Sequence, residues 1–192
     1  MADVATTEPY VEPWLSGSHA DVPAAGRAVL HALELAWDDL RKWTAGLTDD
    51  EAHAAPFGLT PVAYHLRHIA RSVDRILTYA EGGELSAGQL AALKAEKAAD
   101  REPLAAMLGE VQASFARAAG RIRALAGADL NAPRAVGRKR LPTSVGGALV
   151  HVADHTQRHT GQVVTTARLL RAMRPERRGE ETQGEEEGPK TQ

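Results

Sequence analysis

One stretch decides much of the fold: residues 144–162 read SVGGALVHVADHTQRHTGQ. The serine at its start is a residue type that often caps the first turn of a helix, and no proline follows within the stretch. His151, His155 and His159 are spaced four residues apart. In an α-helix each such step rotates by about 40° and rises about 6 Å. The three imidazoles therefore form a row along one flank of a helix that we expect to run from residue 144 to about residue 173.

A second histidine cluster lies in residues 64–69, whose sequence is YHLRHI. His65 and His68 belong to a predicted helix that begins at Thr60–Pro61, with the threonine as its cap and the proline in its first turn. The two segments together contain five of the eight histidines, and the chain has no cysteine. Because thiolate ligands and disulfides are excluded, this concentration of histidines predicts a metal site built from nitrogen ligands.

The rest of the chain also has the apolar period of α-helices. Further helices are expected over residues 22–45, over residues 86–98, and from Pro103 to about residue 127. No segment alternates convincingly with period two, and residues 131–142 are predicted to form a basic, proline-containing loop. We therefore expect an all-α fold, a four-helix bundle in which residues 82–100 are long enough to form a crossover connection.

Length and composition fit one helical domain with two irregular ends. A chain of 192 residues with 43% hydrophobic residues can bury a single core. We predict an irregular arm over residues 1–17, the metal-binding bundle over residues 18–174, and a disordered acidic tail over residues 175–192. The sequence has no signal-peptide pattern and no apolar run of membrane-spanning length, so we expect a cytoplasmic protein without a membrane partner. A formal net charge of −2 disfavours general nucleic-acid binding.

The two clusters have matching positions on helical wheels. In each predicted helix the histidines fall on one side of the apolar centre, with His65 and His159 nearest the core and His68 and His151 farthest from it. A metal bound at this border could keep a coordination position open toward solvent, as catalytic sites require.

Neutral imidazole binds zinc, nickel and iron alike, so the ligand type does not identify the metal. Three neutral ligands leave the ion strongly Lewis acidic, so it could lower the pKa of a bound thiol or water.

The remaining histidines are interpreted as ordinary hydrogen-bonded residues. His31 lies one residue from the apolar stripe of the first predicted helix, and His19 and His53 lie near loops. Isolated histidines in such positions are more often structural than metal-binding. His151, the outermost of its row, is interpreted as a solvated residue or as a residue that contacts a metal-binding side chain.

The two histidine segments resemble those of a known family. The segments HLRHIARS (residues 65–72) and HTQRHTGQ (residues 155–162) are similar to the motifs of the DinB/YfiT-like superfamily of proposed metalloenzymes. These motifs are a histidine followed by isoleucine or leucine and alanine in the second helix, and H-x-x-x-H, often followed by x-Gly-Gln, in the fourth. The resemblance covers roughly residues 20–173. It implies the metal ligands His68, His155 and His159.

The resemblance and the wheels differ on one ligand. The wheels place His65 nearer the core than His68, whereas the shared motif selects His68. His65 is therefore interpreted as a residue that contacts a metal-binding histidine or replaces one as a metal ligand. Gln162, one turn after His159, could orient a ligand or a substrate.

The resemblance also implies a class of function. Members of the superfamily are typically homodimers, some use a metal to activate a low-molecular-weight thiol for transfer or isomerisation, and many have no known reaction. We accordingly expect a metal-dependent transferase or hydrolase that acts on a small molecule. Arg71 or Arg75, on the flank of His68, could bind an anionic substrate. No catalytic residue and no general base are evident from the sequence.

Three alternatives remain open. The protein could be a non-catalytic, metal-stabilised dimeric binding or stress protein. It could also be a zinc hydrolase, since residues 151–155, HVADH, match an inverted zinc-peptidase spacing with aspartate in the glutamate position. The third alternative, nucleic-acid binding through Arg134–Arg140, is disfavoured because this short basic loop contains no aromatic residue.

Overall fold

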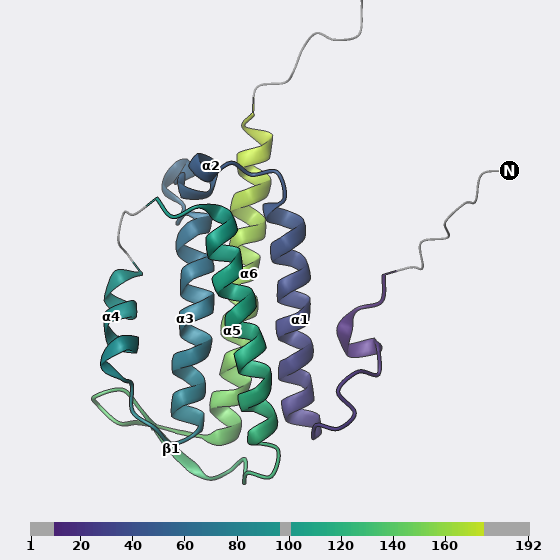
Figure 1. Cartoon of the computed structure of the whole chain (residues 1–192), viewed down its shortest axis with the longest axis vertical. Helices are drawn as coiled ribbons and strands as arrows, with labels where there is room; N and C mark the ends of the chain where they lie inside the picture. Colours follow the sequence, from purple (N-terminus) through teal and green to yellow (C-terminus); the bar gives the residue numbers. More distant parts are fainter. Residues whose placement is uncertain (1–9, 97–100, 175–192) are drawn as a thin grey trace, which may run out of the picture.

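The computed structural model describes residues 10–96 and 101–174 (Figure 1). Four long helices lie side by side: α1 (Ala24–Thr44), α3 (Val62–Ala80), α5 (Leu104–Ala124) and α6 (Val145–Ala172). Helix α6 packs against α1 and α3, and α5 packs against the same two helices. In Figure 1, α3 and α5 run in one direction and α1 and α6 in the other. The expectation of a predominantly helical chain is confirmed.

The shorter element η1 (Pro13–Leu15) precedes α1. Three others lie between the long helices: α2 (Asp49–His53), η2 (Pro56–Gly58) and α4 (Ala87–Ala95). Helix α4 lies beside α3, in the connection between α3 and α5 (Figure 1). This connection is the segment that the sequence predicts to be the crossover. The first nine residues of the predicted arm and the predicted tail, 175–192, lie outside the described residues. Over residues 10–96 and 101–174, every helix is too short or too polar to cross a membrane.

The ends and the apolar faces of the helices follow from the sequence, with one correction. Leu66, Ile69, Val73 and Leu77 recur every three or four residues along α3, and all are at most 1% exposed. The predicted cap of this helix is wrong: Pro61 occupies the cap position, and no side chain caps the first turn. Proline suits this position because it has no backbone N–H that would need a partner.

The expectation of a loop over residues 131–142 is wrong. The segment forms a small antiparallel hairpin of β1 (Pro133–Val136) and β2 (Leu141–Ser144), with Val136 opposite Leu141. Gly137 and Arg140, at the two ends of the turn, have φ angles of 67° and 48°. Each strand has four residues, and its burial does not alternate along the strand. The period-two pattern that identifies longer strands therefore never develops.

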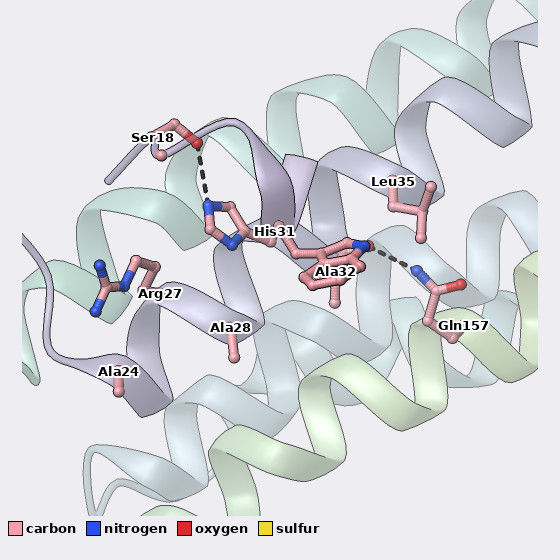
Figure 2. Close-up of a pocket in the computed structure, with 10 residues that line it drawn as sticks. Ser18, Ala24, Arg27, Ala28, His31, Ala32, Leu35 and Gln157 are labelled. Carbon is pink, nitrogen blue, oxygen red and sulfur yellow. Dashed lines mark hydrogen bonds between the residues drawn. The ribbon is translucent and has the colours of Figure 1, made fainter. Parts of the chain in front are cut away.

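A cavity lies on the α1 side of α6, beside the N-terminal 3-10 turn (Figure 2). It has a volume of about 420 Å³ and a largely apolar lining that includes Ala28, Ala32 and Leu35. At its edge the side-chain amide of Gln157 donates a hydrogen bond of 2.7 Å to the backbone oxygen of Ala32, which ties α6 to α1. Gln157 lies two residues after His155, which corresponds to about 200° of helix rotation. The side chains of Gln157 and His155 therefore point to different sides of α6.

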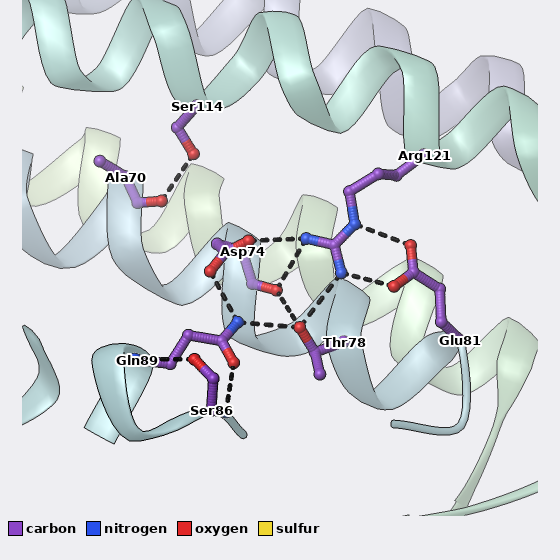
Figure 3. Close-up of polar contacts among 8 residues, drawn as sticks. All are labelled: Ala70, Asp74, Thr78, Glu81, Ser86, Gln89, Ser114 and Arg121. Carbon is purple, nitrogen blue, oxygen red and sulfur yellow. Dashed lines mark hydrogen bonds and ion pairs between the residues drawn. The ribbon is translucent and has the colours of Figure 1, made fainter. Parts of the chain in front are cut away.

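Arg121 links α5 to α3 through a branched network (Figure 3). Its guanidinium donates to Asp74 at 2.7 Å and to both carboxylate oxygens of Glu81, each at 2.7 Å. Gln89 of α4 joins the network by donating to Asp74 at 2.6 Å and to the hydroxyl of Thr78 at 2.9 Å. The end of α3 is thus tied to α5 and to α4 by polar side chains.

Replacing Arg121 with methionine should lower the free energy of unfolding by about 1–2 kcal/mol. The side chain is 24% exposed, and the change leaves the carboxylates of Asp74 and Glu81 without their main partner. Urea unfolding at pH 7 measures the effect. Arg117→Met, an exposed position one turn earlier, is the control, and equal losses in the two variants would contradict this role for Arg121.

Candidate metal centre

Three histidines from two helices converge at the packing surface between α3 and α6. His68 of α3 and His155 and His159 of α6 each offer one ring nitrogen, and these atoms all lie within 4.8 Å of one another. The Nε2 atoms of His68 and His155 are 2.9 Å apart. The ring centroid of His159 lies 4.5 Å from that of His68 and 4.6 Å from that of His155. The four-residue spacing on α6 therefore places two imidazoles where a third arrives from α3.

This arrangement fits a small divalent ion. Zinc binds histidine nitrogen at about 2.0–2.1 Å, and a tetrahedral shell at that radius separates the nitrogens by about 3.3 Å. The 2.9 Å between His68 and His155 needs to open only slightly to reach this separation. All three side chains are half-buried, so the group lies at the border between core and solvent.

His65 is buried beside this group, and His151 is exposed at its edge. His65 is 4% exposed, and its Nδ1 lies 3.0 Å from Nδ1 of His159. That contact leaves Nε2 of His159 as the nitrogen available for an ion. His151 is exposed, and its Nδ1 lies 2.8 Å from the carboxylate of Asp154. The structure thus places His65 behind a candidate ligand and His151 outside the converging group.

Glu96, which no pattern in the sequence indicates, lies beside His68. Its carboxylate accepts a hydrogen bond of 2.8 Å from Nδ1 of His68, and its other oxygen binds Arg75. Burial acts to raise the pKa of Glu96, but the hydrogen bonds from His68 and Arg75 outweigh it and hold the pKa below its usual value. An ionised carboxylate only accepts, so a neutral His68 ring carries its proton on Nδ1 and directs the lone pair of Nε2 at His155.

Three of these histidines, His65, His155 and His159, are held in the neutral form that binds metals. Burial, reinforced by the neighbouring histidines, lowers the pKa of His65 to about 4 and that of His155 to about 4. Burial and His68 also lower the pKa of His159, against a hydrogen bond with Gln162 that acts to raise it. Only neutral imidazole has a lone pair to donate to a metal. Near pH 7 these rings are therefore ready to ligate, and Gln162 contacts one of them.

Both arginines predicted to bind substrate are engaged in ion pairs. Arg71 donates to both oxygens of Glu110, at 2.9 and 3.2 Å. Its side chain is 21% exposed, so this guanidinium borders solvent. Arg75 is buried and binds Glu96, which makes it part of the support of His68. The two arginines therefore differ in their access to a ligand.

A second group of potential ligands consists of His19, His31 and Glu34. Here the guanidinium of Arg123 donates to Nδ1 of His19 at 2.9 Å, which places the proton of a neutral ring on Nε2. That nitrogen lies 2.6 Å from Glu34, and Nε2 of His31 lies 3.0 Å from the hydroxyl of Ser18 (Figure 2). Hydrogen bonds therefore account for this group, and a cation there would lie beside the charge of Arg123.

The neutral histidines should make the stability of the metal-free protein depend on pH. The pKa of His65 is about 4 in the folded protein, against about 6.5 in an unfolded chain. Between these values the unfolded chain binds more protons, so stability is fully present above pH 6.5 and falls as the pH drops toward 4. The free energy of unfolding should decrease by about 1.4 kcal/mol per pH unit for this group.

Urea unfolding in the presence of a chelator at pH 7.5, 6 and 5 measures this dependence. The variant His65→Gln has no group that titrates at this position, so its stability should fall less steeply between pH 6 and pH 5. Identical slopes for the variant and the wild type would contradict the assignment.

Comparison with known proteins identifies the family. The sequence profile of the DinB superfamily matches residues 32–163, which include all five histidines of the two clusters. A comparison with curated proteins found no match. Since the matched region spans more than half of the chain and contains the converging histidines, the protein belongs to the DinB superfamily.

Proposed function

We propose that this protein is a divalent-metal-dependent enzyme whose centre is formed by His68, His155 and His159. The observation that carries the proposal is the convergence of their ring nitrogens within 4.8 Å from two separate helices. Membership of the DinB superfamily supports it. We interpret the four long helices as the four-helix bundle of that family, with the segment containing α4 as its crossover connection.

The partial burial of the three histidines favours a catalytic site over a closed structural one. Catalytic metal sites in proteins use three side-chain ligands and keep a further position for water or substrate. A bound divalent ion would supply a Lewis acid that lowers the pKa of a thiol or of water toward neutrality. The protein itself holds the rings of His155 and His159 neutral, and Glu96 and His65 orient the rings of His68 and His159 through hydrogen bonds.

The resemblance to the family favours a small-molecule substrate, a low-molecular-weight thiol, and a homodimeric assembly. Arg71 is the better candidate for binding an anionic substrate group. It borders solvent, and the side chain of its partner Glu110 is 32% exposed, so an incoming anion could replace the Glu110 carboxylate. The zinc-hydrolase alternative is less favoured because Asp154, its candidate base, pairs with an exposed His151 outside the converging group.

An activity assay on metal-free and reloaded protein tests the proposal. The protein is treated with a chelator, reloaded separately with Zn²⁺, Ni²⁺ or Fe²⁺, and assayed with a panel of low-molecular-weight thiols and an activated aryl chloride. In this reaction the thiol sulfur forms a bond to the aryl carbon while chloride and a proton are released. We expect reloaded wild type to be active and the metal-free protein and His155→Ala to be inactive.

The matched control is His53→Gln, because His53 lies on α2 and bonds the backbone oxygen of Glu102. This variant should retain the activity of the wild type. Turnover that persists unchanged in the metal-free protein and in His155→Ala would refute the proposed function.

A further inference from the structure

Helix α4 is attached to the rest of the protein at both ends by polar side chains. No residue of α4 itself, Ala87–Ala95, is buried. Near its start, Gln89 binds Asp74 and Thr78 of α3 (Figure 3). Directly after its last residue comes Glu96, whose side chain is only 3% exposed. A buried carboxylate at the end of a helix that buries nothing else requires an explanation, since burying a charge is costly unless it is paired.

The pairing of Glu96 leads to the metal centre. One carboxylate oxygen accepts the 2.8 Å hydrogen bond from Nδ1 of His68, and the other binds the guanidinium of Arg75. The ring of Tyr64 stacks on His68 with an interplanar angle of 9° and a centroid distance of 5.5 Å. The imidazole is therefore fixed at its edge by Glu96 and at its face by Tyr64, with Nε2 directed at His155.

We propose that Glu96 is the positioning residue of the metal centre, which fixes the tautomer and orientation of His68 and thereby couples the docking of α4 to metal binding. The inference rests on the proposed metal-binding function. A neutral histidine without such a partner divides its proton between two nitrogens, and in one of the two tautomers Nε2 cannot ligate. The carboxylate removes that tautomer and adds negative charge near the ion.

The coupling follows from the chemistry of the imidazole ring. A cation on Nε2 withdraws electron density, so Nδ1–H becomes a stronger donor to Glu96. The contact that improves metal binding is then itself strengthened by the metal, as thermodynamic linkage between two sites requires. Because α4 has no buried side chain of its own, strengthening this contact should hold the helix more firmly against α3.

The affinity of the metal-free protein for Zn²⁺ tests the positioning role. Competition with a chromophoric chelator at pH 7.5 compares wild type with Glu96→Gln and Glu96→Ala. Loss of an outer partner of a ligand histidine typically lowers metal affinity 10- to 100-fold, and we expect about this loss for Glu96→Ala. Glu96→Gln should be intermediate, because its amide oxygen still accepts a hydrogen bond from His68 but carries no charge.

Glu110→Gln is the matched control. Glu110 also pairs with an arginine of α3, Arg71, and among the described residues no hydrogen bond or ion pair joins it to the three converging histidines. The affinity of the Glu110→Gln variant for Zn²⁺ should stay within roughly twofold of wild type. This change is well below the 10-fold loss expected when the hydrogen-bond partner of a ligand histidine is removed. If Glu96→Ala does not fold, as judged by circular dichroism, Glu96→Gln decides the question.

Hydrogen exchange of the α4 amides provides a readout that a purely structural role would not move. Zn²⁺ should slow exchange over residues 87–96 in wild type and leave it unchanged in Glu96→Ala. The positioning role would be overturned if both Glu96 variants bound Zn²⁺ as tightly as wild type. The coupling would be overturned if Zn²⁺ did not change the exchange rates of the α4 amides in wild type. Failure of wild type to bind Zn²⁺ at all would instead refute the proposed function.

Discussion

Replacing His155 with alanine should weaken Zn²⁺ binding by more than about 100-fold. Loss of the hydrogen-bond partner of a metal ligand costs at most about this factor in affinity, and loss of the ligand itself should cost more. His155 provides one of three converging nitrogens, and its Nε2 lies 2.9 Å from that of His68. Binding to the folded state alone stabilises a protein by about 4 kcal/mol at a ligand concentration 1,000 times Kd. Zn²⁺ should therefore raise the Tm of wild type clearly and that of His155→Ala little. Calorimetry with and without Zn²⁺ measures both shifts.

The companion variant His151→Ala separates this account from the zinc-hydrolase alternative. His151 lies one turn before His155 on α6, but it is exposed and paired with Asp154. Its removal should leave the Zn²⁺-induced rise in Tm nearly intact. An equal loss of that rise in both variants would place the ion on the 151–155 pair and contradict the centre described above.

Truncation of Leu66 to alanine should have the largest effect on stability. Leu66 is fully buried on α3, between His65 and Arg67 in sequence. Removing a buried leucine leaves a cavity and typically costs about 2–5 kcal/mol, a large fraction of the about 5–15 kcal/mol that stabilises a domain. Urea unfolding in the presence of a chelator measures the loss without any contribution from metal.

The volume-conserving change Leu66→Met is the control for this prediction. It keeps the apolar volume of the side chain and should cost less than about 1.5 kcal/mol. A loss below about 1 kcal/mol in Leu66→Ala would mean that the core around α3 is not packed as the structure shows it.

The long helices could be predicted from the sequence because each carries a repeated signal. Along α3, four apolar residues at helical spacing are all buried, and Ser144 caps α6 by accepting a hydrogen bond from the backbone N–H of Gly147. Short elements carry no such repetition. The hairpin has only four residues in each strand, and α2 has five residues in all, so neither is long enough to show its period.

The candidate site shows the same division between local and tertiary information. His155 and His159 could be paired from the sequence because four residues are one helical turn. Glu96 could not be found in this way, since it lies 28 residues from His68 and reaches it only when α4 docks on α3. The proximity of His19, in the loop before α1, to Glu34 of α1 likewise depends on how that loop folds back on the helix.

The position of a bound ion tests the central claim most directly. Crystals of the zinc-loaded protein, measured at the zinc absorption edge, give an anomalous peak at each bound ion. We predict one peak about 2.0–2.1 Å from ring nitrogens of His68, His155 and His159. A peak at His19, His31 and Glu34 instead, or none within coordinating distance of the three predicted ligands, would contradict the account.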